Sequence, residues 1–273
     1  MAETKSHPYH IVNPSPWPFS LAVSLFFLLL GSALFLHQHA LGYPFAALGF
    51  VSVIATVYHW WKDVIHEGRV DKAHTEQVRQ GLRMAMALFI LSEVAFFFAF
   101  FWSFFKAWLD PVHLLDDIWP TVLSSWPPAG IKTFDPWDIP FINTLILLLS
   151  GTTATWAHYA VDDNNQEEAT TALGITVLLG MTFTCLQGFE YYHAPFKFSD
   201  GIYPTNFYLA TGFHGAHVII GTIFLAVCYF RSKAGHFVKG NGHLGFEFAS
   251  WYWHFVDVVW LFLFVFVYVL AGK

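Results

Sequence analysis

Long runs of apolar residues alternate along this chain with shorter polar stretches. A transmembrane helix needs about 20 predominantly apolar residues to cross the hydrocarbon core, and seven runs are close to that length. We expect each run to be a helix, because backbone N–H and C=O groups in lipid must be hydrogen-bonded within the segment. A β-barrel would show short alternating strands instead. The runs are residues 19–36, 43–61, 84–105, 139–157, 169–189, 202–230 and 248–272.

The composition agrees with a lipid environment. Of the 273 residues, 56% are hydrophobic and only 12% are charged, whereas soluble domains carry about 25% charged residues. So few charges cannot cover a soluble surface of this size, which predicts an all-α integral membrane protein. The net charge of −6, without an extended basic patch, argues against nucleic acid as a partner. Cys185 and Cys228 both lie in apolar runs, which argues against a disulfide framework or a cysteine-based metal site.

The distribution of lysine and arginine predicts an orientation. Cytoplasmic loops carry the excess of basic residues, so the richer side is expected to be the inner one. This places the N-terminus inside and the C-terminus outside. We found no internal repeat and no linker, and we expect one membrane domain, 1–273, in which the polar loop 62–80 divides helices within 19–61 from helices within 84–272. The inner side would carry Lys5, Lys62, Arg69, Lys72, Arg79, Arg83, Arg231, Lys233 and Lys239, and the outer side Lys106, Lys132, Lys197 and Lys273.

Glu93 is the one acidic residue in the third run. It follows Met84 by nine residues, about 14 Å along a helix, and so lies near the middle of a hydrocarbon core of ~30 Å. A charged carboxylate there costs several kcal/mol, so we expect Glu93 to be protonated, paired or turned towards the protein interior. Two interpretations remain open: a proton-relay or regulatory carboxyl, and a protonated carboxyl hydrogen-bonded between helices.

Two histidines, His214 and His217, are three residues apart in the sixth run and are expected to share a helix face. Gly212, Gly215 and Gly221 accompany them. Histidines beside glycines can ligate haem, but one helix cannot supply both axial ligands, so a partner on a facing helix would be needed. The alternative is close helix packing with the histidines donating across the interface.

Other ionisable residues in or beside the spans have simpler explanations. His254 and Asp257 are also three apart, and we expect them to pair with each other rather than to hold a metal. Glu190 and His193 follow the fifth run closely, and we expect both at the membrane interface, where solvation is cheap.

The polar stretch between the second and third runs is rich in basic residues. Such clusters beside membrane helices suit anionic lipid head groups, and the alternative is ordinary topology-determining charge. Nearby tryptophans could stack on lipid chains or form an interfacial belt. The sequence has no P-loop, GxSxG, HExxH or Rossmann motif, so no catalytic residue is expected. The polar cluster is His66, Glu67, Arg69, Lys72, His74, Arg79 and Arg83, and the tryptophans are Trp60, Trp61, Trp102 and Trp108.

Several longer motifs are more specific. Taken in order, they resemble subunit III of the A-type haem–copper cytochrome c oxidases over essentially the whole chain. They are HPYHIVNPSPWP (7–18), WWKDVI (60–65), GLR (81–83) leading to LSEV (91–94), TWAH (155–158), EYY (190–192), TGFHGAHVIIG (211–221) and WYWHFVDVVWLFL (251–263).

The resemblance implies a fold and a role. It implies that the two and the five helices form bundles around a V-shaped cleft holding phospholipids. The chain would flank catalytic subunit I, with subunit II in the same complex, haem and copper in those partners, and cytochrome c as the substrate; a respiratory supercomplex is a further implied assembly. It implies no catalytic residue, metal or redox centre on this chain, and a supporting role in sustained turnover and proton uptake.

The resemblance also assigns residues. Glu93 matches the family's membrane carboxyl. Lipid contacts are assigned to Arg83, His74, Glu67 and Arg231, with Trp60 and Trp102 beside the lipid chains.

Other hypotheses stay open from the sequence. A quinol oxidase subunit is related, but the NPSPWP opening favours cytochrome c. A proton-coupled transporter would use Glu93, yet transporters usually show repeats or broken helices. A membrane b-type cytochrome would use His214, His217 and His254. The run FAFFWSFF (98–105) and the long outer connection favour a bacterial inner membrane, with the mitochondrial inner membrane as the alternative.

Overall fold

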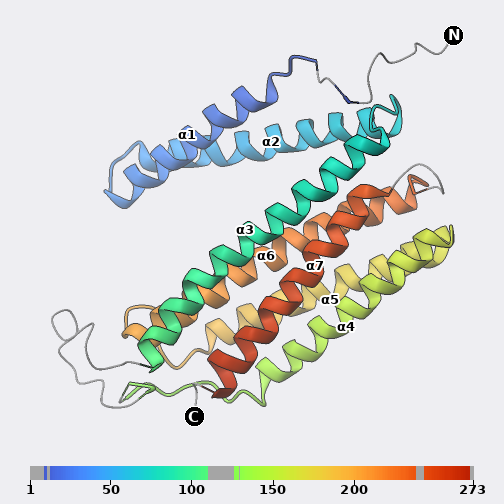
Figure 1. The fold of residues 1–273 in the computed structure, drawn as a ribbon. Helices are drawn as coiled ribbons and strands as arrows, with labels where there is room; N and C mark the ends of the chain where they lie inside the picture. Colours follow the sequence, from blue (N-terminus) through green and yellow to red (C-terminus); the bar gives the residue numbers. More distant parts are fainter. Residues whose placement is uncertain (1–8, 11–12, 110–125, 129, 238–242, 271–273) are drawn as a thin grey trace, which may run out of the picture. The chain divides into compact units, whose positions relative to one another are not determined.

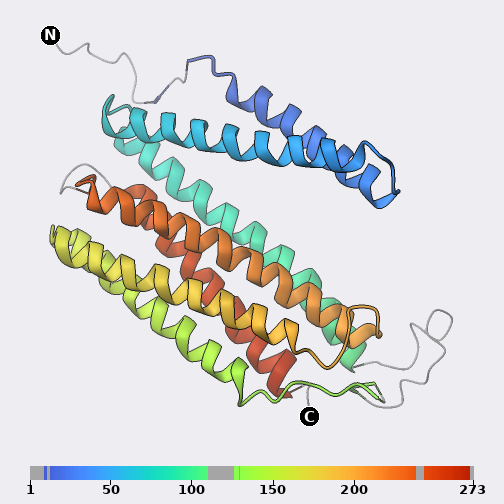
Figure 2. The same ribbon diagram turned by 180° about the vertical axis from the view of Figure 1, so that it is seen from behind.

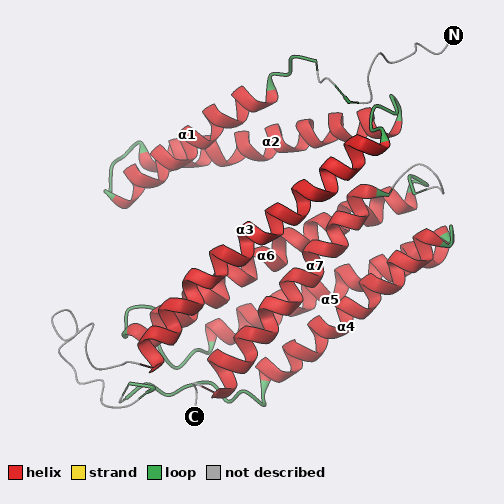
Figure 3. Ribbon diagram, viewed as in Figure 1, coloured by secondary structure: helices red, strands yellow, loops and turns green. Residues whose placement is uncertain are grey.

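The computed structural model describes residues 9–10, 13–109, 126–128, 130–237 and 243–270. Within these residues the regular elements are all helical, and no strand occurs (Figure 3). Seven helices are long and apolar enough to cross a membrane, which confirms the predicted fold class. They are α1 (Trp17–Leu36), α2 (Gly42–Arg69), α3 (Glu76–Leu109), α4 (Ile139–Asp162), α5 (Gln166–Tyr192), α6 (Ile202–Lys233) and α7 (Leu244–Phe262), which continues as the π-helix η1 (Leu263–Leu270) (Figure 1).

The helices extend beyond the apolar runs that predicted them. α2 continues to Arg69 and α3 begins at Glu76, so the stretch 62–80 that we predicted as a loop is mostly helical. The apolar run marks only the part of a helix that suits hydrocarbon. Backbone hydrogen bonds within a helix do not depend on lipid, so the helix continues with polar side chains past the interface. The long outer connection begins with the last turn of α3, and residues 110–125 and 129 lie outside the described residues.

The chain divides into two compact units, 1–84 and 85–273, and α3 runs through the division. In the first unit α1 and α2 lie side by side and antiparallel (Figures 1 and 2). The buried positions of this pair are all small residues that recur every seventh position, which keeps them on one helix face. They are Ser24 and Gly31 on α1, and Gly42, Gly49 and Thr56 on α2.

Backbone contact between α1 and α2 requires these glycines. A Cβ added to Gly49 would overlap the backbone of Leu28, and one added to Gly31 would overlap the backbone of Ala46. Lipid tails are as apolar as leucine side chains, so membrane helices associate through close packing and not through hydrophobic burial. The glycines therefore hold this helical hairpin together.

The second unit is built around α7. Within it α4 packs on α5, α5 on α6, and both α6 and α4 on α7. More than half of the spanning window of α7 is buried (56%), against 6% for that of α3. α7 is therefore the central helix, and α3 lies at the periphery, where large aromatic side chains such as Phe97 and Phe104 connect it to the core.

Two tryptophans of α7 anchor α4. The indole N–H of Trp253 donates to Ser150 Oγ and that of Trp260 donates to Thr144 Oγ1, each at 2.9 Å. Both indoles are fully buried, so each N–H needs a partner within the protein. Gly180 and Gly221 leave the space for the Trp253 ring, because a Cβ at either position would press against it.

The packing of α1 on α2 predicts a selective effect of a single methyl group. We expect Gly49→Ala to destabilise the chain by about 1–3 kcal/mol, because the added carbon overpacks a rigid backbone contact. The thermal unfolding midpoint of the purified protein in mild detergent measures this. Gly81→Ala is the matched control: an added Cβ there has nothing within 4 Å, and alanine favours helix. Equal midpoints for the two variants would contradict the packing argument.

Candidate functional site

The carboxyl of Glu93 on α3 is paired with His217 on α6. Glu93 Oε2 lies 2.8 Å from His217 Nε2, and the two side chains are 22% and 12% exposed. The second nitrogen of the ring, His217 Nδ1, lies 2.6 Å from the carbonyl oxygen of Phe213 one turn earlier. Of the three states expected for a carboxyl in mid-membrane, the structure therefore has the paired one.

The two hydrogen bonds of His217 determine the charge of this pair. A carbonyl oxygen only accepts, so Nδ1 carries a proton and donates it to Phe213. The contact with Glu93 then holds one further proton. If it resides on the carboxyl, both groups are neutral; if it resides on Nε2, a carboxylate faces an imidazolium. In either case the pair has no net charge, as a site within hydrocarbon requires.

Aromatic rings enclose His217. The Phe97 ring approaches it edge-on with centroids 4.9 Å apart, and the Tyr252 ring stacks beside it at 6.2 Å. Apolar rings exclude water and lower the local dielectric, which strengthens the Glu93–His217 contact. The arrangement positions a neutral, proton-sharing pair between α3 and α6.

His214 and His217 lie three residues apart on α6, the spacing of one helix face, but their burial differs. Three residues turn a helix by about 300°, leaving an offset of roughly 60°, so the two rings can contact different neighbouring helices. His214 is fully buried, with Nε2 3.2 Å from the carbonyl oxygen of Val256. Its ring packs against Trp260 and Phe183, with centroids 5.1 and 5.7 Å away.

The predicted pairing of His254 with Asp257 is confirmed as a close contact. His254 Nδ1 lies 3.7 Å from Asp257 Oδ2, which is longer than a hydrogen bond. The other ring nitrogen, Nε2, lies 3.2 Å from Thr155 Oγ1 on α4. Gly151 leaves the space for this carboxylate, since a Cβ there would overlap Asp257 Oδ2.

The expectation that Glu190 is solvated was wrong. This residue is 1% exposed, and its Oε1 accepts from the hydroxyl of Tyr268 at 2.7 Å and from the amide of Gln187 at 3.3 Å. Tyr268 belongs to η1, 78 residues further along the chain. Burial here comes from a tertiary contact that local sequence does not reveal. His193, by contrast, is exposed as expected.

Two of the proposed lipid contacts come together in the first unit. The carboxylate of Glu67 and a ring nitrogen of His74 lie within 4.8 Å of each other and of a nitrogen of His10. Sequence reasoning missed His10, although it belongs to the motif at 7–18. Arg83 Nη1 lies 3.8 Å from Glu76 Oε1, and Trp60 is half-buried on α2.

The other proposed lipid contacts lie in the second unit. The guanidinium of Arg231 sits over the ring of Phe237, 5.1 Å from its centroid. Trp102 is 64% exposed on α3 and packs against Phe98 with centroids 6.1 Å apart. Stacking leaves the edge of a guanidinium able to donate to phosphate, and an exposed indole suits the membrane interface.

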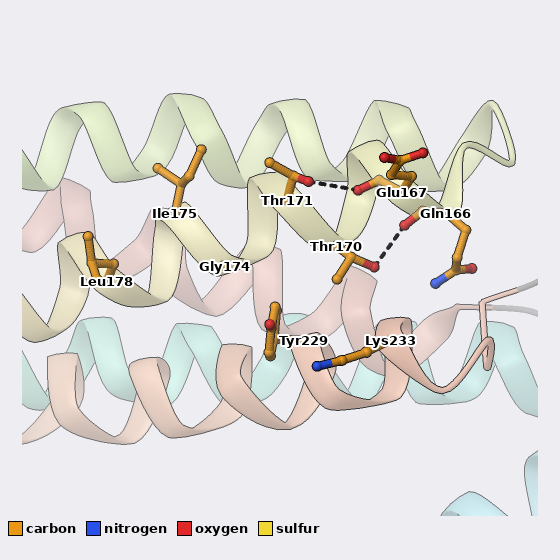
Figure 4. Close-up of a pocket in the computed structure, with 9 residues that line it drawn as sticks. All are labelled: Gln166, Glu167, Thr170, Thr171, Gly174, Ile175, Leu178, Tyr229 and Lys233. Carbon is orange, nitrogen blue, oxygen red and sulfur yellow. Dashed lines mark hydrogen bonds between the residues drawn. The ribbon is translucent and has the colours of Figure 1, made fainter.

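A groove that sequence reasoning missed runs between α5 and α6 (Figure 4). Its volume is about 690 Å³. Lys233 extends along it towards Tyr229, while the hydroxyls of Thr170 and Thr171 are turned back to backbone carbonyls of their own helix (Figure 4). Leu178 lines the apolar end. An ammonium group beside apolar side chains is suited to contact a lipid. In the sequence, a lysine four positions after a tyrosine was the signal that could have indicated this groove.

Comparison with known proteins identifies relatives along the full chain. The family model described as "Cytochrome c oxidase subunit III" matches residues 7–272. A probable cytochrome c oxidase subunit 3 of Rickettsia bellii is 63% identical over 270 residues, covering 98% of each chain. The cytochrome c oxidase subunit 3 of Arabidopsis thaliana is 50% identical over 272 residues, covering 100% of each chain. That of Oncorhynchus mykiss is 49% identical over 264 residues, covering 97% of each.

The hydrogen bonds of the membrane histidines generate a prediction about haem and copper. His217 has both ring nitrogens in hydrogen bonds, His254 has one near Thr155 and the other beside Asp257, and His214 is packed between aromatic rings. We therefore expect the chain, purified on its own, to contain neither iron nor copper and to show no haem Soret band. Absorption spectroscopy and elemental analysis measure both. Either metal at one equivalent per chain would overturn this reading of the histidines.

Proposed function

The chain belongs to the cytochrome c oxidase subunit III family, and from this premise we propose that it is the non-redox, lipid-binding subunit III of a proton-pumping oxidase. It is a multi-pass membrane protein and part of an oxidoreductase complex. In the proposed role it contacts catalytic subunit I, with subunit II in the same complex and haem and copper in these partners. It stabilises subunit I and supports proton uptake while cytochrome c reduces oxygen to water, alone or within a respiratory supercomplex.

The single observation that carries this proposal is the state of the Glu93–His217 pair. A relay needs a chain of ionisable groups or waters at neighbouring depths. His217 instead directs its second nitrogen to the backbone carbonyl of Phe213, so a proton leaving through the ring would have to break that bond. The geometry supports a pair that stabilises or regulates the oxidase, with the redox chemistry and the main proton path elsewhere in the complex.

Phospholipid binding is supported by the chemistry of several surfaces. Large apolar side chains are exposed along the spans, and basic residues lie near helix ends. The proposed head-group contacts are Arg83, His74, Glu67 and Arg231, with Trp60 and Trp102 beside the chains, and the groove at Lys233 adds a further candidate. The V-shaped cleft between the two groups of helices stays a prediction.

The membrane placement is also a proposal. The surplus of basic residues supports an N-terminus inside and a C-terminus outside. The similarity to a Rickettsia bellii protein supports a bacterial inner membrane, while relatives from a plant and a fish keep the mitochondrial inner membrane as the alternative.

Removal of two arginines tests the lipid contacts. We expect Arg83→Ala with Arg231→Ala to reduce the phospholipid retained by the purified complex, because each guanidinium can present a bidentate fork to phosphate. Mass spectrometry of the intact complex counts the lipids. Lys62→Ala, which removes an exposed charge from α2, is the control for charge alone. An unchanged lipid count in the double variant would refute the assignment.

Substitution of Glu93 tests the role of the pair. Glu93→Gln removes the titratable proton and keeps most hydrogen-bonding capacity. We expect this variant to retain most oxygen consumption and proton release per electron in reconstituted vesicles, with faster loss of activity during turnover. Glu93→Ala is the companion variant: it leaves His217 without its partner and should lose activity faster still. Complete loss of pumping by an assembled Glu93→Gln complex would make the carboxyl an obligatory proton carrier.

A further inference from the structure

Three metal-ligating side chains converge where α4 ends and α7 begins. His158 and Asp162 are four residues apart on α4, so they lie on one helix face. His243 immediately precedes α7. One ligand atom from each of the three residues lies within 4.8 Å of the other two. None of the three has a part in the function proposed above.

The cluster is partly assembled and partly unsatisfied. His243 Nε2 lies 2.9 Å from Asp162 Oδ1, so two of the three groups already meet. His158 is different: both of its ring nitrogens are buried, and neither has a hydrogen-bond partner. Buried polar atoms are normally paired, so an imidazole with two unpaired nitrogens beside another imidazole and a carboxylate points to a bound group that completes the site.

We propose that His158, Asp162 and His243 form a binding site for a divalent transition-metal ion of the Zn²⁺ class. Zn²⁺ binds imidazole nitrogen and carboxylate oxygen at about 2.0–2.2 Å, which sets ligand atoms of a tetrahedral site roughly 3.3 Å apart. The three ligand atoms now lie within 4.8 Å of one another, so side-chain rotation has to bring them closer. Two nitrogen ligands out of three disfavour Mg²⁺ and Ca²⁺, which select oxygen.

The surroundings suit a cation with access from water. The carboxylates of Asp162 and Glu247 both act electrostatically on the His158 ring. Phe246 packs on that ring with centroids 5.8 Å apart and closes one side. The Asp162 side chain is 51% exposed, which leaves a path for the ion and a coordination position for water. Three protein ligands plus water is a common zinc arrangement.

A metal here would tie the end of α4 to the start of the central helix α7. We expect the ion to act by joining these two helix ends, and Zn²⁺ itself undergoes no redox change. This inference revises our expectation that the chain has no metal site, and it leaves the expected absence of haem and copper unchanged.

The test is Zn²⁺ binding by the purified oxidase complex. The complex is freed of loosely bound metal with a chelator, and calorimetry with Zn²⁺ compares the wild type with His158→Ala, Asp162→Asn and His243→Gln. We expect each variant to bind one Zn²⁺ fewer per complex, or to bind it at least 100-fold more weakly. His193→Ala, which removes an exposed histidine that contacts its own helix, should bind as the wild type does.

Two further readouts make the outcome decisive. X-ray absorption spectroscopy of the wild-type complex should show nitrogen and oxygen neighbours for the Zn²⁺ that the variants do not bind. Zn²⁺ should also raise the thermal unfolding midpoint of the wild type and not that of the variants. Haem absorption shows whether each variant complex has assembled. If the His158→Ala complex does not assemble, the comparison is made with Asp162→Asn, whose side chain has nearly the same shape as the original. Equal stoichiometry and affinity in the wild type and the assembled variants would overturn the site without affecting the proposed function.

Discussion

A polar group in hydrocarbon must find its partner within the protein, and the second unit is organised by this constraint. The two buried indoles of α7 donate to hydroxyls of α4, and these bonds set how the helices face each other. The same requirement explains the contact of Glu93 with His217, because a carboxyl on an apolar helix is less costly when it is paired. The carboxyl of Glu190 on α5 finds a partner in the hydroxyl of Tyr268, which belongs to the π-helix η1 that continues α7.

Close approach of backbones is the complementary requirement. Helices in lipid gain little from burying apolar surface against each other, so they associate where small residues allow contact. Gly49 against Leu28 illustrates this in the first unit. In the second, Gly180 and Gly221 receive the ring of Trp253, so the tryptophan that donates a hydrogen bond is also the one that fills the space between helices.

These two requirements also shape the functional surfaces. Most histidines of the spans have a structural partner, which agrees with a supporting subunit whose complex keeps its redox groups elsewhere. His158 differs in that neither of its ring nitrogens has a partner, and both stand beside Asp162 and His243 near the end of α4. Among the histidines of the described spans, His158 has both ring nitrogens buried and unpaired, whereas His214 has only Nδ1 unpaired, so the His158 ring is informative about a ligand.

The sequence by itself determined the seven spans, because the length of an apolar run is a local property, and it also revealed the family. It indicated that Glu93 is protonated, paired or turned towards the protein interior, and that His254 pairs with Asp257, three residues away on the same helix. Only the tertiary structure decided that His217, 124 residues from Glu93, is that partner. It also buried His214 more fully than His217 and buried Glu190, because contacts between helices depend on rotation and crossing angle, which the pattern along one helix does not encode.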